Sequence, residues 1–182
     1  MPRTSVRRAA PDDAPLLYVL AAATFALACP PGTTEEAIAD FIATQLSEER
    51  FAGYLADAAR DVLIVEADDE PVGYSMLVAE QSHDPDVLAV VSEPSAVELS
   101  KFYLLSGAHG TGAAAALMEA SVEHARLRSA AVLWLGVNQH NARANRFYEK
   151  HGFENVGIKH FLVGGKREDD YVRARPLSPL VE

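Results

Sequence analysis

The chain has 182 residues, 49% of them apolar and 23% charged, which is the composition of a globular domain with a substantial core rather than of a disordered segment. Its net charge of −10 argues against a nucleic-acid partner, because binding to phosphates needs a surface rich in Lys and Arg. An acidic surface steers cationic substrates towards a protein, although it can also serve solubility alone. We therefore expect a single domain over residues 1–182.

The one cysteine, Cys29, excludes an intrachain disulfide and a metal site built from several cysteines, and we expect no metal. A reducing cytoplasm is the simplest location for such a chain. Three arginines before an apolar run that ends at Cys29 also resemble a secretory signal, but Asp12 and Asp13 interrupt that pattern. No apolar run reaches the ~18 residues that a membrane-spanning helix needs, so we expect no membrane partner.

The first third of the chain predicts an edge strand followed by three helices. Pro30 ends the first helix, Thr33 or Thr34 caps the second, and Ser47 caps the third. The expected ranges are residues 4–9 for the strand and residues 12–28, 35–46 and 48–59 for the helices.

The rest of the chain alternates strands with two further helices. Apolar runs predict strands at residues 61–66, 72–80, 97–105, 131–137, 153–163 and 170–174, and helices at residues 113–128 and 141–151. Residues 81–95 are expected to form a loop with a short strand at 87–91, and Gly164-Gly165 a turn. This order is typical of a mixed α/β protein in which helices cover one layer of sheet.

A glycine-bearing turn stands between the strand at 97–105 and an alanine-rich helix. A helix N-terminus has unpaired N–H groups and a partial positive charge, and glycine lets a ligand approach the backbone, so Gly110 and Gly112 indicate a phosphate or pyrophosphate cradle. No Gly-Lys-Ser/Thr follows, which excludes a Walker A loop. Residues 110–115 match the dinucleotide fingerprint GxGxxA, but three strands precede them and no acidic residue ends the next strand. A tight turn without a ligand is the alternative.

A second motif, residues 137–153, reads VNQHNARANRFYEKHGF. Asn141 is the expected N-cap of its helix, and Gly152 is expected to end it. Ala144, Phe147 and Tyr148 share one face, where a tyrosine can also be an ordinary core residue.

Together these two motifs resemble those of the GNAT superfamily of acyl-CoA-dependent N-acetyltransferases. The family's Q/R-x-x-G-x-G/A turn corresponds to residues 109–114, with His109 in place of Gln or Arg. Its N-x-x-A-x-x-F-Y-x-x-x-G-F motif matches residues 141–153 without a gap, and VRRAAPDDAPLL resembles its first strand and helix. The resemblance implies the acyl-CoA N-acyltransferase fold, α/β with a mixed, mostly antiparallel central sheet of about seven strands and flanking helices, splayed between strands 4 and 5.

The resemblance also implies how the co-substrate acetyl-CoA would bind. Its pantetheine would pair with the backbone of residues 102–104, a backbone N–H near Leu104 would polarise the thioester carbonyl, and Asn141 would contact the pantetheine arm. Tyr148 would act as the general acid that protonates the departing thiolate. The residues expected to bind acetyl-CoA are Phe102, Tyr103, Leu104, His109, Gly110, Thr111, Gly112, Ala113, Ala114, Ala115 and Asn141.

The proton of the attacking amine needs an acceptor, and Glu98 is the best candidate base. Period-two alternation places Glu98, Ser100 and Phe102 on one face of their strand. The carboxylate could act directly or through water in a ternary complex, and a solvated strand-end carboxylate is the alternative. Cys29 as an acyl carrier is disfavoured.

The tail resembles the bacterial spermidine/spermine N-acetyltransferase branch, because IKHFLVGG follows the second motif and precedes the acidic run Glu168-Asp169-Asp170. A polyamine or another small amine is therefore the expected substrate, while protein N-termini, aminoglycosides and amino acids stay open. The rival functions are an acetyl-CoA-binding regulatory module without turnover and a dinucleotide-binding oxidoreductase. Many proteins of this fold form homodimers, and that is open for this chain.

Overall fold

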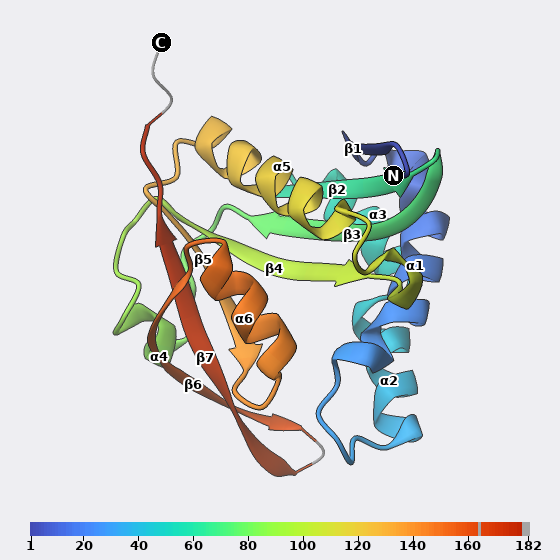
Figure 1. Ribbon diagram of the computed structural model, residues 1–182. Coiled ribbons are helices and arrows are strands. Elements are labelled where there is room, and N and C mark those ends of the chain that lie inside the picture. The colour runs from blue at the N-terminus through green and yellow to red at the C-terminus, as the bar shows by residue number, and fades with distance from the viewer. Residues whose placement is uncertain (164, 180–182) are drawn as a thin grey trace. The chain divides into compact units, whose positions relative to one another are not determined.

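A computed structural model of the protein describes residues 1–163 and 165–179 (Figure 1). The predicted turn at Gly164-Gly165 lies partly outside these residues, at Gly164. The elements, in which η denotes a 3-10 helix, are β1 (Thr4–Arg8), η1 (Pro11–Asp13), α1 (Ala14–Ala28), α2 (Glu35–Gln45), α3 (Glu48–Ala56), β2 (Arg60–Ala67), β3 (Glu70–Val78), α4 (Pro85–Leu88), β4 (Ala96–Leu104), η2 (Ser106–Ala108), α5 (Ala113–Leu127), β5 (Val132–Asn138), α6 (Ala142–Lys150), β6 (Glu154–Val163) and β7 (Lys166–Pro176).

The strands form a seven-stranded sheet in the order β1-β2-β3-β4-β5-β7-β6, which confirms the predicted fold class. The β1–β2, β5–β7 and β6–β7 pairs are antiparallel, and the β4–β5 pair is parallel. The parallel register joins Ala96–Glu98 to Val132–Trp134, although β4 continues to Leu104 and β5 to Asn138. The splay that the resemblance implies between strands 4 and 5 stays a prediction.

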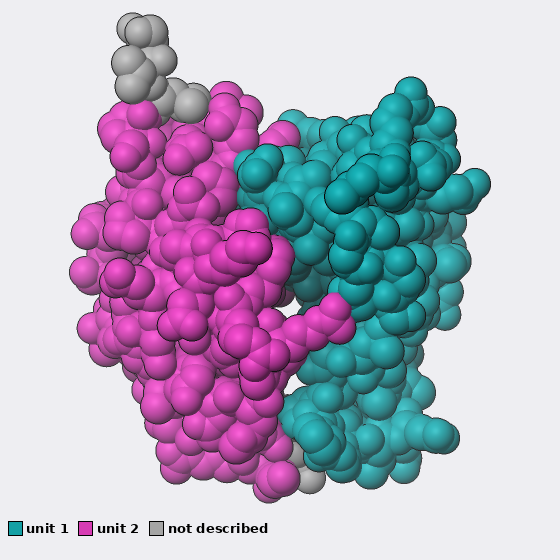
Figure 2. All heavy atoms as spheres, viewed as in Figure 1, with its two compact units in different colours: residues 1–77, 101–121 teal, residues 78–100, 122–182 magenta. Residues whose placement is uncertain are grey.

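The chain divides into two compact units (Figure 2). Unit 1 comprises residues 1–77 and 101–121, and unit 2 comprises residues 78–100 and those from Val122 onward. Each unit has a core of its own. The core of unit 1 includes Leu63, Val65, Ala108, Ala113 and Leu117, and that of unit 2 includes Val87, Val91, Ala96, Trp134, Val172 and Ala174.

Helix α1 begins at Ala14, after η1, rather than at residue 12. Helices α2 and α3 begin where the sequence predicts, because their caps form. The Thr34 hydroxyl accepts a hydrogen bond from the Ala37 N–H, and the Ser47 hydroxyl accepts one from Arg50, both at 3.1 Å. Helix α1 contains no charged residue and buries one side through Ala14, Leu17, Leu20, Ala21 and Thr24. None of the helices in the described part of the chain has both the length and the apolar character that a membrane span requires.

Two predicted elements differ in the structure because side chains of Asp turn the backbone. The strand expected at residues 87–91 is wrong, since helix α4 covers Pro85–Leu88. Asp84 caps this helix by accepting the Asp86 N–H at 2.9 Å, and proline fixes the first helical position. Helix α3 ends at Ala56 rather than at residue 59, because the Asp57 carboxylate accepts the N–H two residues ahead at 2.9 Å.

Strand β7 begins four residues earlier than expected, at Lys166 rather than at Asp170. Its first residues are charged, so they lack the apolar alternation that marks a strand in sequence. Pairing with β6, from Val163↔Lys166 onward, makes them extended. A non-local backbone ladder therefore overrides the local composition at this end of β7.

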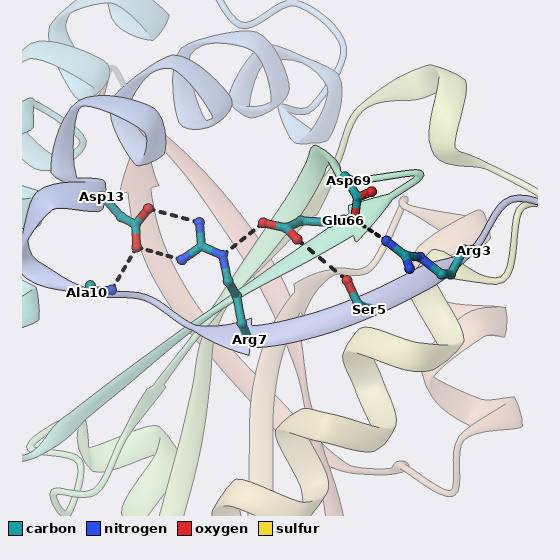
Figure 3. A network of polar contacts seen from close by, with 7 residues as sticks. All are labelled: Arg3, Ser5, Arg7, Ala10, Asp13, Glu66 and Asp69. Atoms are coloured by element: carbon teal, nitrogen blue, oxygen red, sulfur yellow. Dashed lines mark hydrogen bonds and ion pairs between the residues drawn. The ribbon is translucent and has the colours of Figure 1, made fainter.

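An ion-pair network in unit 1 joins β1 to β2 and to the start of α1 (Figure 3). Arg7 binds both carboxylate oxygens of Asp13, at 2.7 and 2.9 Å, and its Nε donates to Glu66 at 2.8 Å. Asp13 also accepts the Ala10 N–H at 2.7 Å. The hydrogen bonds from Arg7 lower the pKa of Asp13, although its partial burial opposes the shift.

Replacing Asp13 with Asn should lower the free energy of unfolding near neutral pH by about 1 kcal/mol or less, since the arginine is partly exposed and solvent screens the pair. The carboxylate stabilises the fold above its ordinary pKa of 3.8, and this contribution is lost as pH falls through the lowered native value. Denaturant unfolding of both proteins at about pH 7 and about pH 3 should therefore show a smaller difference at the lower pH. Asp69→Asn, which removes the exposed Arg3–Asp69 pair, is the control and should change little. An Asp13→Asn effect that is equal at both pH values contradicts this account.

Candidate functional site

The predicted cradle lies in unit 1, where the chain passes from β4 through η2 into α5. Gly110 and Gly112 have φ of +79° and +87°, in the left-handed region that favours glycine. A Cβ built on either residue would meet no heavy atom within 4 Å, so there is open space beside both. The turn therefore combines a glycine-requiring backbone with room for a ligand.

Backbone N–H groups at the start of α5 are the donors that this turn can offer. Ala116 donates the first intrahelical bond of this turn, to the Gly112 carbonyl at 3.0 Å. The N–H groups of Ala114 and Ala115 come before that bond, so they have no acceptor within the helix. The helix start also carries a partial positive charge. This donor set fits an anionic group such as a diphosphate.

The turn is anchored on both sides by the core of unit 1. Ala108 precedes it and Ala113 follows it, and both are buried in the cluster around Leu117. Within the turn, the Thr111 hydroxyl donates to the Ala108 carbonyl at 2.6 Å, while His109 is exposed. The core therefore holds the start of α5 in place, and the side chain that departs from the family motif faces solvent.

The end of β4 places its side chains into unit 1 rather than leaving them for a ligand. Phe102 and Leu104 pack against the same core cluster as the turn. The Tyr103 ring lies 5.7 Å from the ring of Tyr74, centroid to centroid. These side chains are partly buried in unit 1, and the backbone of residues 102–104 stays the predicted contact for a pantetheine.

Glu98 belongs to unit 2 and lies at the paired start of β4. Its neighbours Val97 and Leu99 are buried, while Glu98 is partly exposed. This alternation agrees with the predicted strand face. Glu98 is aligned with the buried Trp134 in the parallel register. The carboxylate is accessible enough to exchange a proton, and its role as base stays a prediction.

Asn141 and Tyr148 also belong to unit 2 and lie at opposite ends of helix α6. Asn141 is the predicted N-cap, and its Oδ1 accepts the Ala144 N–H at 3.1 Å. Its Nδ2 is then the group that can donate to a ligand. The partly buried Tyr148 ring packs edge-on to Phe153 at 5.9 Å and to Phe147 at 5.6 Å.

Unit 1 thus holds the residues predicted for the diphosphate and for backbone pairing with pantetheine, Phe102–Leu104 and His109–Ala115. Unit 2 holds Glu98, Asn141 and Tyr148, of which Asn141 is also a predicted pantetheine contact. Two polar residues that the sequence pattern did not indicate are buried in unit 2: Asn145 on helix α6, which carries Tyr148, and Arg173 on β7. Asn145 lies at an unspecified position of the 141–153 motif, and no spacing in the sequence connects it to Arg173.

The acidic run on β7 is paired with basic side chains of the same hairpin. Lys166 lies 3.5 Å from Glu168, and Asp169 is contacted by His160 at 2.6 Å and by Arg167 at 3.4 Å. Burial raises the pKa of Asp170 to about 6, with the nearby Lys159 opposing the shift and the neighbouring carboxylates adding to it. Within the described residues, no group of three or more His, Cys, Asp or Glu side chains is arranged to hold a metal ion.

Comparison with known sequences shows which family this turn and helix belong to. The profile of the acetyltransferase (GNAT) family matches residues 26–153, so the chain belongs to the GNAT family. It is 47% identical over 165 residues to an uncharacterized N-acetyltransferase of Mycobacterium tuberculosis (strain ATCC 25618 / H37Rv), which covers 91% of this chain and 98% of the relative. The protein is therefore an N-acetyltransferase, an enzyme of the acyltransferase class.

Solved structures show the same fold at low sequence identity. The PaiA N-acetyltransferase from Thermoplasma acidophilum, in complex with coenzyme A, has a TM-score of 0.75 at 17% identity, over 96% of this chain and 99% of that one. A ribosomal-protein-alanine N-acetyltransferase from Brucella melitensis has a TM-score of 0.71 at 23% identity, over 95% and 99%. At these identities the likeness shows the fold alone.

Replacing Gly112 with Asp should weaken coenzyme A binding at least about tenfold, because a carboxylate would stand beside the two phosphates. Gly112→Asn is the matched control, since Asn has the same shape and tolerates the same left-handed φ without the charge. Calorimetric titration of both variants with coenzyme A measures the difference. Equal coenzyme A affinities for the two variants would show that this turn does not bind the diphosphate.

Proposed function

We propose that this enzyme transfers the acetyl group of acetyl-CoA to a primary amine by direct attack in a ternary complex. The observation that carries the proposal is the open glycine turn at the start of α5, in a chain that belongs to the GNAT family. The turn offers Ala114 and Ala115 N–H groups and a helix N-terminus to a diphosphate, which coenzyme A contains. A buried anchor on each side holds the turn in place before the ligand arrives.

Acetyl-CoA, when bound, supplies the thioester carbon that the amine attacks. A backbone N–H near Leu104 stabilises the negative charge that develops on the thioester oxygen. The Asn141 amide, with its oxygen committed to the helix cap, donates from Nδ2 to the pantetheine arm. The Tyr148 hydroxyl gives its proton to the sulfur as the carbon–sulfur bond breaks. Glu98 accepts the proton that the ammonium group must lose, directly or through one water.

Replacing Tyr148 with Phe should lower kcat by about a hundredfold, because proton delivery to the leaving thiolate is lost while the aromatic packing stays. Acetyl-CoA affinity measured by calorimetry should change little. Tyr18→Phe removes a hydroxyl from an exposed position on α1 and is the control. A kcat that is unchanged when chemistry limits turnover would exclude Tyr148 as the acid.

For the acceptor we propose a small primary amine, with a polyamine as the first compound to test. A chain with a net charge of −10 attracts a polycation over long range. The acidic run Glu168–Asp170 is weaker support than its sequence suggests, because Lys166 and Arg167 of the same hairpin offset part of its charge. A protein N-terminus is the second candidate, since the Brucella melitensis neighbour is named for acetylating ribosomal-protein alanine.

An amine panel read by thiol release separates these acceptors. Spermidine should be acetylated, with kcat/KM falling as salt is added, because screening removes the long-range attraction. A peptide with an N-terminal alanine and an aminoglycoside are the comparison acceptors. Faster turnover of the peptide, independent of salt, would exclude the polyamine assignment and leave acetyl transfer in place.

A coenzyme-binding module without turnover is the alternative from another class. Acetyl-CoA and coenzyme A should raise the melting temperature, whereas NAD should not, because ligands stabilise the native state they bind. Binding without thiol release across the whole panel favours the module.

We also propose a cytoplasmic location, which suits a chain with Cys29 as its one thiol.

A further inference from the structure

Arg173 on β7 is the one buried cationic residue in the described part of the chain, with 7% of its surface exposed. Its hydrogen bonds go to neutral oxygens. Nε donates to Asn145 Oδ1 at 2.8 Å, and Nη1 donates to the Phe153 carbonyl at 3.1 Å. The guanidinium also lies 5.9 Å from the centre of the Tyr171 ring. Burying a charged group costs free energy, so the burial of Arg173 with these fixed contacts needs an explanation.

Asn145 carries the first of these contacts to the start of α6. It is the buried residue of this short, polar helix, with 8% exposure. Its Nδ2 donates to the Asn138 carbonyl at the end of β5, at 3.0 Å, and to the Asn141 carbonyl, at 2.9 Å. Through this amide, Arg173 is linked to the last residue of β5 and to the N-cap of α6.

The Phe153 carbonyl carries the second contact to the other end of α6. The Phe153 N–H donates to the Tyr148 carbonyl at 3.0 Å, and the Phe153 ring packs against the Tyr148 ring. One guanidinium thus connects to both ends of α6. Nine residues are too few for a stable isolated helix, so tertiary contacts of this kind must set its position.

We propose that Arg173 is the positioning residue of α6: acting through Asn145 at the N-terminus and Phe153 at the C-terminus, it holds Tyr148 in the orientation needed for proton transfer. The inference rests on the proposed role of Tyr148. A planar guanidinium can serve two acceptors in fixed directions, whereas a lysine ammonium on a flexible stem cannot reproduce that geometry. The substitution Arg173→Lys therefore keeps the positive charge and removes the planar group that donates to two acceptors at once.

Hydrogen exchange tests the structural half of the proposal without any substrate. Arg173→Lys should speed exchange of the α6 amides by about tenfold while leaving those of α5 unchanged. Arg175→Lys is the matched control, because Arg175 lies two residues along β7 and its hydrogen bond goes to the C-cap of α6, the His151 carbonyl, at 3.0 Å. The control should not change exchange at Asn145. Unchanged α6 exchange in Arg173→Lys would overturn the proposal.

A double-mutant cycle tests the functional half, with the best acceptor of the amine panel. Arg173→Lys should lower kcat about tenfold in the otherwise unchanged enzyme and less than about twofold in a Tyr148→Phe background. Equal factors in both backgrounds would show a general structural effect and overturn the proposal. If Arg173→Lys does not fold, Asn145→Asp serves instead, since it keeps an oxygen for Arg173 and removes both donors to backbone carbonyls.

The role of Tyr148 as the acid and the role of Arg173 in positioning it can be excluded separately. If Tyr148→Phe leaves kcat unchanged, the proposed acid is wrong, and the functional half of this inference fails with it. Suppose instead that Tyr148→Phe lowers kcat, but Arg173→Lys lowers kcat by the same factor in both backgrounds. Tyr148 then keeps its role as the acid, and only the positioning role of Arg173 is excluded. Acetyl-CoA affinity should fall less than kcat does, because Asn141 is the predicted coenzyme contact linked to Arg173, while the predicted diphosphate contacts belong to unit 1.

Discussion

The proposed coenzyme site depends on one backbone constraint, the passage from β4 into α5. Gly110 and Gly112 adopt left-handed φ so that the chain can turn, and Ala113 is fully buried at the point where the helix begins. A fixed helix start keeps its N–H groups directed and its partial charge in place without reorganisation when an anion arrives. The two glycines have open space beside them, so a ligand can still approach the anchored turn.

Helix α6 shows the opposite situation, because the proposed acid Tyr148 lies on a helix too short to be stable in isolation. It has nine residues, and its Asn141 cap secures only its first turn. The buried Arg173 and Asn145 join this helix to strands β5 and β7 and to Phe153, the residue before β6. A buried arginine with neutral partners is a poor source of stability, and it offers directional contacts that apolar residues would lack.

The hairpin of β6 and β7 shows why charge in a sequence is a weak guide to a substrate. Glu168, Asp169 and Asp170 are consecutive, and alone they indicate an acidic surface. Antiparallel pairing places His160 opposite Asp169 and Lys159 opposite Asp170. The charge that remains for a ligand is therefore set by the register of two strands, which no local pattern reveals.

The sequence by itself determined the features that depend on near neighbours. The Thr34, Ser47 and Asn141 caps, the glycine turn and the family motifs that flank it are all local, so the fold class and the candidate residues could be predicted from them. Contacts between residues far apart in the chain set the early start of β7 and the link from Arg173 to α6, so these appeared only in the tertiary structure. Arg173 and Asn145 are 28 residues apart, and burial joins them through contacts that no sequence period encodes.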